Sequence, residues 1–178
     1  MNDKIKNVII IGINVCILTV CSWIKIPFVI PITLQTLGVY LICGIYDFKI
    51  SFTSLIIYII LGLLGLPVFS SFQGGVGIIL GPTGGYILSF IFVPLILEFF
   101  RKFLNSNEFI LLGLSLLLSQ IVIYLIGTLW FVFVYLESNN EYTFMSALIT
   151  TVLPFLIFDI IKMIVSNIVI IRIKKYIR

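Results

Sequence analysis

Six apolar segments dominate the pattern of the chain, and short polar or glycine- and proline-containing stretches separate them. The apolar segments cover residues 7–24, 34–46, 50–66, 81–100, 109–136 and 143–171. A membrane-spanning helix needs roughly 17–25 apolar residues. The pattern therefore predicts an all-α polytopic membrane protein, a six-helix transmembrane bundle formed by a single domain over residues 1–178. The second segment is short, which favours a tilted or partly inserted helix, and the last two are long enough to tilt.

Composition supports a membrane protein and argues against several other classes. Of the 178 residues, 61% are hydrophobic and 10% are charged, whereas soluble domains carry roughly 25% charged residues. The apolar runs are continuous rather than alternating, which disfavours outer-membrane strands. The sequence has no histidine, and its three cysteines form no CxxC pair. We therefore expect no metal site and no cofactor.

Motifs of common enzymes are missing as well. The sequence contains no GxxxxGK[ST] phosphate loop, and without histidine it has no base for a serine nucleophile of the usual kind. These observations favour a binding and translocating subunit over an enzyme, with any ATP hydrolysis carried out by separate ATPases.

The basic residues predict how the chain is oriented. If the N-terminus is cytoplasmic, the outer segments hold Lys25 alone, and the loop at residues 137–141 has two acids and no base. The inner segments hold Lys4, Lys6, Lys49, Arg101, Lys102, Arg172, Lys174, Lys175 and Arg178. This asymmetry fits the positive-inside rule. It predicts two cytoplasmic termini, and it gives the basic residues a role in orientation rather than in binding nucleic acid.

A glycine-rich segment at residues 74–86 is the first candidate for a binding site. It contains six glycines, one proline and no charge in a very apolar chain. Such a density of glycine indicates sharp bends or the close approach of another molecule. Non-helical backbone at membrane depth survives only where it is buried in protein or lines a cavity. The segment is thus predicted to form a non-helical wall of a site, and the alternative is a simple turn between two helices.

Asp159 and Lys162 are the second candidate, because they are the charges that lie well inside an apolar segment. Three residues separate them, so they share one face of a helix. An intramembrane charge is a functional-site candidate by default, and the alternative is an ion pair that only makes the helix tolerable. Side by side, an acceptor and a donor match a urea or lactam, although the lysine alone matches a ligand carboxylate. Pro154 lies upstream, where it is expected to kink the helix.

Four motifs, in order along the chain, resemble the BioY family, the biotin-specific substrate-capture (S) components of energy-coupling factor (ECF) vitamin transporters. The motifs are PITLQT at residues 31–36, YIILGLLGLPVF at 58–69, GGVG at 74–77 followed by LGPTGGY at 80–86, and the Asp-x-x-Lys of the last segment. The resemblance covers essentially the whole chain.

The resemblance implies an outward-facing biotin pocket in a six-helix bundle, roofed by the loop at residues 25–33. Asp159 is expected to accept from the ureido N–H groups of biotin and Lys162 to donate to the ureido oxygen, with Lys162 on the ligand carboxylate as the alternative. Amides of the 74–77 segment are expected to bind the carboxylate. The implied substrate-binding residues are Asp159, Lys162, Gly74, Gly75, Gly77, Tyr86, Gln35 and Thr83, with Trp23 and Phe69 as further ring contacts.

The resemblance also implies partners, namely an ECF coupling transmembrane subunit and two ABC-type ATPases, in addition to membrane lipids. Capture subunits of this group carry an Ala-x-x-x-Ala stripe on the first helix for docking, but here the first apolar segment has no alanine. Gly12 and Cys16 are the nearest pair of small residues four apart, and small residues let helices approach closely. The rival functions are an S component for another vitamin, such as thiamine or riboflavin, and a membrane scaffold that transports nothing.

Overall fold

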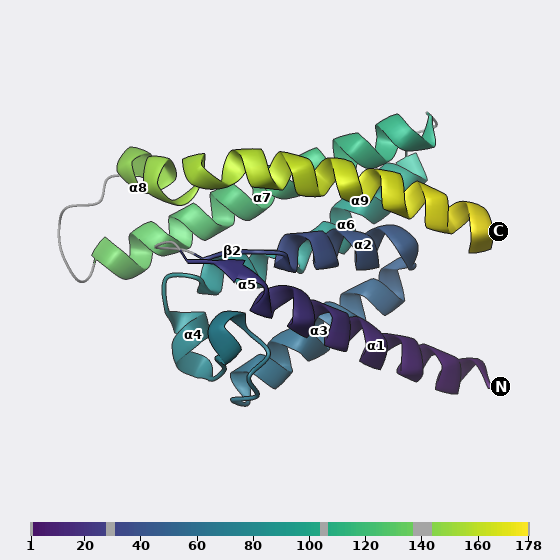
Figure 1. Ribbon diagram of the computed structural model, residues 1–178, viewed down its shortest axis with the longest axis horizontal. Coiled ribbons are helices and arrows are strands. Elements are labelled where there is room, and N and C mark those ends of the chain that lie inside the picture. The colour runs from purple at the N-terminus through teal and green to yellow at the C-terminus, as the bar shows by residue number, and fades with distance from the viewer. Residues whose placement is uncertain (1, 28–30, 104–106, 137–143, 178) are drawn as a thin grey trace.

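The protein is a bundle of helices with a very short hairpin. The structure, a computed structural model, describes residues 2–27, 31–103, 107–136 and 144–177. Its elements (Figure 1) are α1 (Asp3–Trp23), β1 (Lys25–Ile26), β2 (Ile32–Thr33), α2 (Gln35–Ile45), α3 (Phe48–Leu63), η1 (Ser70–Phe72), α4 (Val76–Leu80), α5 (Gly84–Ser89), α6 (Phe92–Phe103), α7 (Glu108–Leu136), α8 (Phe144–Thr151), η2 (Leu153–Phe155) and α9 (Leu156–Ile177).

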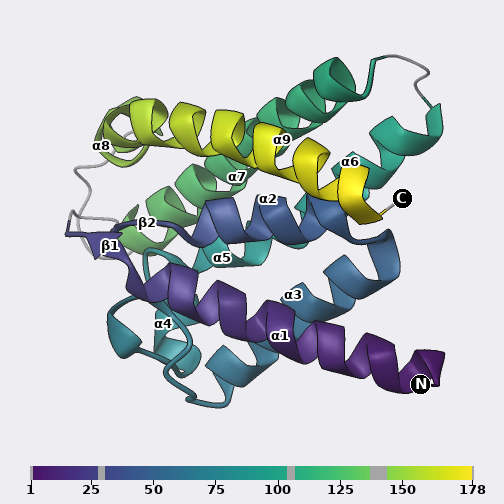
Figure 2. The same ribbon diagram turned by 45° about the vertical axis from the view of Figure 1, so that its right-hand side comes forward.

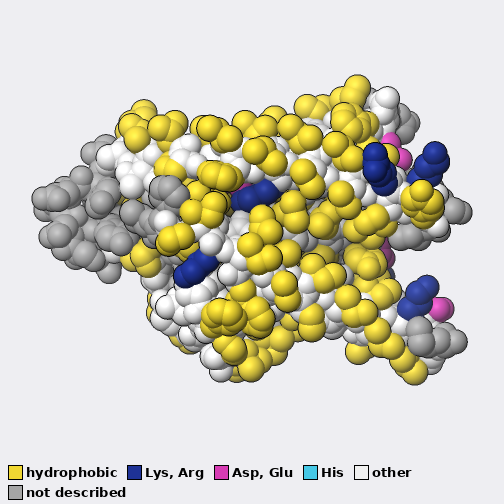
Figure 3. All heavy atoms as spheres, in the orientation of Figure 1, with side chains coloured by type: hydrophobic (Ala, Val, Ile, Leu, Met, Phe, Trp, Pro, Cys, Tyr) yellow, Lys and Arg dark blue, Asp and Glu magenta, His cyan; other side chains and the backbone are white. Residues whose placement is uncertain are grey.

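The helices have the length and apolar character of a multi-pass membrane protein. Within the described residues, four stretches are long and apolar enough to cross a membrane: Asp3–Trp23, Gly84–Lys102, Glu108–Val134 and Met145–Tyr176. The two shorter apolar helices are α2 and α3, so the prediction that the second segment is short is confirmed. Hydrophobic side chains cover much of the face drawn in Figure 3, as expected for a surface that contacts lipid.

Helix α2 occupies the middle of the bundle. It contacts α1, α3, α6 and α9, and Figures 1 and 2 both show it between α1 and α9. Seven of its eleven residues are buried, which explains why a helix too short to span the membrane by itself is stable here. Most helical stability in proteins comes from such packing.

Arg101 of α6 holds the C-terminal end of α2 in this position. Its guanidinium donates to the backbone oxygens of Cys43 at 2.7 Å, Gly44 at 2.8 Å and Tyr46 at 3.1 Å. The last carbonyls of a helix have no partner within the helix. A cation at that end satisfies them and also interacts favourably with the helix dipole.

The glycine-rich segment is more helical than its composition predicts. Residues 76–80 form α4, and α5 begins at Gly84, so the prediction of non-helical backbone across 74–86 is wrong for these residues. The reason is that a chain inside a membrane must satisfy its own backbone groups, and a helical turn does so. The turn into α4 is made by Gly75, which has a φ of 100° that other residues rarely adopt.

The predicted break in the last apolar segment is confirmed. Helix α8 ends at Thr151, the 3-10 turn η2 contains Pro154, and α9 begins at Leu156. Proline lacks a backbone N–H and its ring obstructs the preceding turn, so a continuous helix is disfavoured there. Phe155 of η2 is buried and the first buried residue of α9 is Asp159, whereas Leu156, Ile157 and Phe158 are exposed.

Both ends of the chain lie at one end of the molecule (Figure 1). Basic side chains gather at the same end in Figure 3, where the last turn of α9 carries Lys174 and Lys175. The opposite end carries the β1–β2 hairpin, η1 and α4 (Figures 1 and 2).

Candidate binding site

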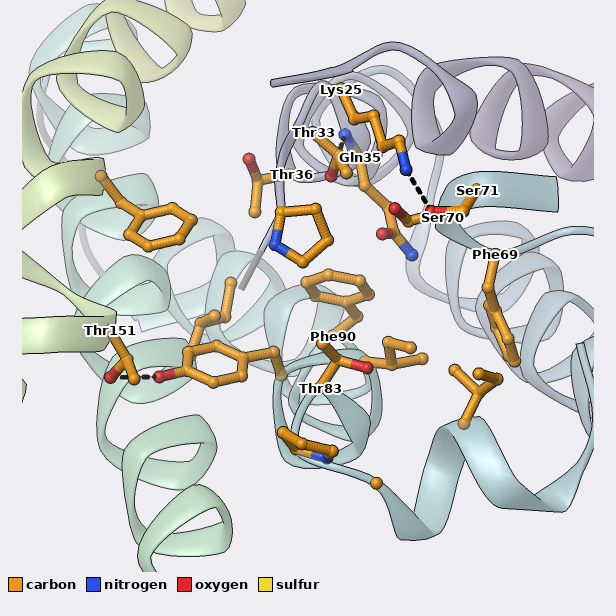
Figure 4. A pocket seen from close by; sticks show the side chains of 18 of the residues that line it. Lys25, Thr33, Gln35, Thr36, Phe69, Ser70, Ser71, Thr83, Phe90 and Thr151 are labelled. Carbon is orange, nitrogen blue, oxygen red and sulfur yellow. Dashed lines mark hydrogen bonds between the residues drawn. The ribbon is translucent and has the colours of Figure 1, made fainter. Parts of the chain in front are cut away.

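A cavity of about 370 Å³ lies at the end of the bundle that carries the hairpin. Its walls come from the hairpin, the start of α2, the η1 segment, the region from α4 to the end of α5, the middle of α7, and the α8–η2–α9 region (Figure 4). The volume falls within the roughly 300–1,000 Å³ of small-molecule sites. Segments that are far apart in the sequence thus enclose one site.

Asp159 and Lys162 both line this cavity. They form an ion pair with 2.7 Å between Lys162 Nζ and Asp159 Oδ1, and their side chains are 5% and 8% exposed. The two residues thus form a local ion pair and also face an open space. Removing one partner of a buried pair leaves an uncompensated charge and is strongly destabilising.

Helix α7 supplies two further donors to the carboxylate. Tyr124 OH donates to Asp159 Oδ2 at 2.6 Å, and Gln120 Nε2 donates to the same oxygen at 3.1 Å. Tyr40 of α2, which is fully buried, donates in turn to Gln120 Oε1. An amide that accepts from Tyr40 through its oxygen must present its N–H group to Asp159, so this contact fixes the orientation of the amide.

The lysine ammonium is held from a third helix. Lys162 Nζ also donates to Thr36 Oγ1 of α2 at 3.2 Å. An ammonium has three N–H donors, and the contacts within the described part of the chain use two of them. The pair is thus tied to α2 and α7 while its helix, α9, forms the cavity wall.

The family model described as "BioY family" matches residues 1–178, the full length of this chain. The chain belongs to the BioY family. A relative in Pyrococcus horikoshii named "Probable biotin transporter BioY" is 38% identical over 163 residues, which are 89% of this chain and 90% of the relative. "Biotin transporter BioY" of Thermotoga maritima is 31% identical over 172 residues, 92% of this chain and 93% of the relative.

A solved structure is also similar to this chain. A crystal structure of the S-component for biotin from an ECF-type ABC transporter matches with a TM-score of 0.86 and 27% identity, covering 98% of this chain and 93% of that one. The BioY family is a family of transporter components, so this chain is not an enzyme.

Of the eight site residues predicted from sequence, six line the cavity of this BioY-family chain. They are Asp159, Lys162, Gln35, Gly77, Thr83 and Tyr86. Gln35 Nε2 donates at 2.8 Å to Tyr58 OH, which donates at 2.9 Å to the Val68 backbone oxygen. The amide of Gln35 is therefore held against the wall next to α3.

Tyr86 contributes more than the predicted apolar contact. Its hydroxyl donates to Thr151 Oγ1 at 2.9 Å and lies 3.2 Å from Thr128 Oγ1. The bond at Thr151 is drawn in Figure 4. Tyr86 thereby joins α5 to α7 and α8 beside the break that precedes α9.

Gly74 and Gly75 do not line the cavity, and they serve the turn instead. The Gly75 N–H donates to the Gly62 backbone oxygen at 2.6 Å, so it is not available to a ligand carboxylate as predicted. A Cβ at Gly74 would overlap the Leu66 backbone, which explains glycine there by close packing. These two glycines are explained by the close contact of two backbone segments and not by contact with a ligand.

Of the other predicted contacts, Phe69 lines the cavity and Trp23 does not. The indole N–H of Trp23 donates to the Pro67 backbone oxygen at 2.9 Å, and its ring lies 4.7 Å from that of Phe72. Trp23 therefore ties the end of α1 to the loop after α3.

The predicted docking pair lies away from the cavity. Gly12 and Cys16 are on an exposed apolar face of α1 together with Ile9, Ile13, Ile17 and Val20. A Cβ at Gly12 would meet no atom within 4 Å, so this face is open to a lipid or to another helix.

Sequence reasoning missed Gln120, Tyr124, Thr36 and Lys25, which also line the cavity. A signal was present for two of them. Gln120 and Tyr124 lie four residues apart in an otherwise apolar helix, so they share a face, and a buried amide needs a partner.

Proposed function

We propose that this protein captures biotin from the outside of the cell and delivers it across the membrane as the S component of an ECF transporter. The observation that carries the proposal is the buried Asp159–Lys162 pair on the wall of a small-molecule-sized cavity. The names of the relatives and of the matching crystal structure point to the same ligand.

The donors and acceptors around the pair match a cyclic urea. A carboxylate offers roughly four acceptor sites, two on each oxygen. Gln120 and Tyr124 occupy Oδ2, and Lys162 occupies one site on Oδ1. One site on Oδ1 remains for a ureido N–H, and the third N–H of Lys162 can donate to the ureido oxygen next to it.

The rest of the cavity suits the apolar part of biotin. Phe69, Phe90, Ile123 and Phe155 line it, and such side chains favour a fused ring and an aliphatic chain over water. Bringing the ureido group to Asp159 therefore places the hydrophobic rings against a hydrophobic wall.

In the proposed arrangement, six helical segments cross the cytoplasmic membrane of a bacterium, and residues 1–178 act as a single domain. Both termini are cytoplasmic, which is supported by their position at the basic end of the molecule. The cavity then lies in the outer half of the bundle, where biotin can reach it.

The proposed partners are an ECF coupling transmembrane subunit, two ABC-type ATPases and the surrounding lipids, with no nucleic acid and no cofactor. The apolar face of α1 around Gly12 and Cys16 is the proposed docking surface, because its small residues permit close helix contact. ATP hydrolysis by the partners would then drive release to the cytoplasm.

Thermal unfolding of the purified protein with each of four vitamins or analogues tests which of these compounds the protein binds. A ligand that binds the folded state at 100 times its Kd stabilises it by about 2.7 kcal/mol. Biotin and desthiobiotin should raise Tm, whereas thiamine and riboflavin should not. Stabilisation by thiamine or riboflavin alone would identify another vitamin as the substrate, and no response to any of the four would favour a scaffold.

The Asp159→Asn variant extends this test to the site. It should lose the biotin-dependent rise in Tm while still inserting into membranes, because it lacks the anion that receives the ureido N–H. Glu98→Gln is the matched control, since Glu98 forms a surface pair with Lys102 at 3.1 Å. An unchanged response in Asp159→Asn would assign the buried pair a structural role only.

A further inference from the structure

Two lysines line the cavity, and their charges are balanced differently. Lys162 is paired with Asp159. Lys25 is exposed, and its Nζ donates to Ser71 Oγ, a neutral hydroxyl. Among the described residues, no ion pair includes Lys25. Of the two lysines, Lys25 is therefore the one that no acidic side chain among the described residues neutralises.

Lys25 is more exposed to solvent than the ion pair. It lies in β1 opposite Thr33 of β2 and is exposed, whereas the side chains of Asp159 and Lys162 are 5% and 8% exposed. The cavity thus has a cation at its mouth and an anion–cation pair deeper inside.

The charge pattern of the whole chain makes Lys25 unusual. It is the one base that the sequence places on the outer side if the termini are cytoplasmic. A lysine on the outer side works against the orientation that the other basic residues favour. A role in binding a ligand would explain why a lysine occurs at this position.

The partner of Lys25 lies on a strained piece of backbone. Ser71 and Phe72 have φ values of 65° and 58°, which cost energy for residues other than glycine. Residues held in this way cluster at ligand clamps. Lys25 belongs to β1 and Ser71 to η1, and Figure 4 shows them meeting across one side of the cavity.

We propose that Lys25 binds the carboxylate of the ligand at the mouth of the cavity, with the Ser71 hydroxyl beside it. This inference rests on the proposed function, because it takes biotin as the ligand. Lys162 is the poorer partner, since an anion bound there would lie next to Asp159, and like charges repel strongly where water is scarce. Biotin is therefore oriented with its ureido ring inward and its acid chain outward.

A comparison of biotin with its uncharged carboxamide tests this orientation. Kd values for both ligands are measured by titration calorimetry on the purified full chain and on Lys25→Met, which keeps the length of the side chain and removes its charge. Lys25→Met should weaken biotin binding about tenfold, the value of one charge-assisted contact. Binding of the carboxamide should stay the same, so the preference for the acid disappears.

Two further variants serve as controls. Lys25→Arg should retain the preference for biotin, because it retains the charge. Lys49→Met removes a lysine that does not line the cavity and should change neither Kd.

Two results would overturn the inference. If Lys25→Met keeps the full preference for biotin over the carboxamide, another group holds the carboxylate. If both ligands weaken equally, Lys25 acts on the shape of the loops and not on the charge. A wild-type protein that binds neither ligand would instead refute the proposed function, so the two failures are distinguishable.

Discussion

At the residue scale, the site centres on one carboxylate that is bonded from two helices. Asp159 accepts from Lys162 on its own helix and from Gln120 and Tyr124 on α7. Burying an ion pair is not in itself a gain in stability, because each charge loses its hydration. The network is better explained by what it does for a ligand, since it fixes the direction in which each donor and acceptor points.

The buried hydroxyl of Tyr40 is predicted to act on the ligand through Gln120. Tyr40 does not line the cavity, but its hydroxyl orients the amide that donates to Asp159. Tyr40→Phe should weaken biotin binding about fivefold, the value of a neutral hydrogen bond, as measured by titration calorimetry.

A double-mutant cycle separates this role from general packing. In a Gln120→Leu background, Tyr40→Phe should cause no further loss, because the amide that it positions is gone. Additive losses would show that Tyr40 affects the site by a route other than Gln120.

At the scale of elements, the fold depends on a short helix that cannot cross the membrane alone. Helix α2 brings Thr36 to Lys162 and Tyr40 to Gln120. Its position is set by helices on several sides and by Arg101 at its C-terminal end. The break around Pro154 also borders the cavity, since Thr151, Phe155 and Asp159 on either side of it line the wall. Irregular elements thus place the functional groups, and the long helices support them.

Removal of the Arg101 contacts should loosen α2. Arg101→Met leaves the terminal carbonyls of Cys43 and Gly44 without this donor, which should lower stability by about 2 kcal/mol. The adjacent Lys102→Met is the control, since an exposed pair contributes roughly 0–1 kcal/mol. Thermal unfolding in detergent measures both, and equal effects would show that the carbonyl contacts contribute little.

At the scale of the whole molecule, one end opens into the cavity and the other end gathers basic residues and both termini (Figures 1 and 3). Between these two ends, the lateral surface is apolar, and α1 carries the small residues Gly12 and Cys16 on its exposed face. A capture subunit needs both features, because it must bind a ligand on one side and contact a membrane partner from the flank.

Blocking the α1 face should separate uptake from binding. Gly12→Leu places a side chain where nothing lies within 4 Å of the Cβ, so the isolated protein should fold and bind biotin as before. Uptake by cells that contain the coupling subunit and ATPases should fall at least about tenfold, because bulky residues prevent close helix contact. Val165→Leu adds bulk on the exposed face of α9 and should leave uptake intact; equal uptake in both variants would place docking elsewhere.

The sequence by itself determined the helical class, the short second segment, the break at Pro154 and the shared face of Asp159 and Lys162. These features follow from local rules: apolar length, the missing N–H of proline and the helical repeat act within a few residues. The motifs that resemble the BioY family are also contiguous, which is why they could be read directly.

Only the tertiary structure decided which distant groups meet. Tyr40 and Gln120 are 80 positions apart, and Tyr124 and Asp159 are 35 apart, so no local pattern records their contacts. The same holds for Gly75, whose amide meets Gly62 rather than a ligand, and for Lys25, which the hairpin brings to the mouth of the cavity. Side-chain partners across helices depend on how the helices pack, and packing is a property of the assembled bundle.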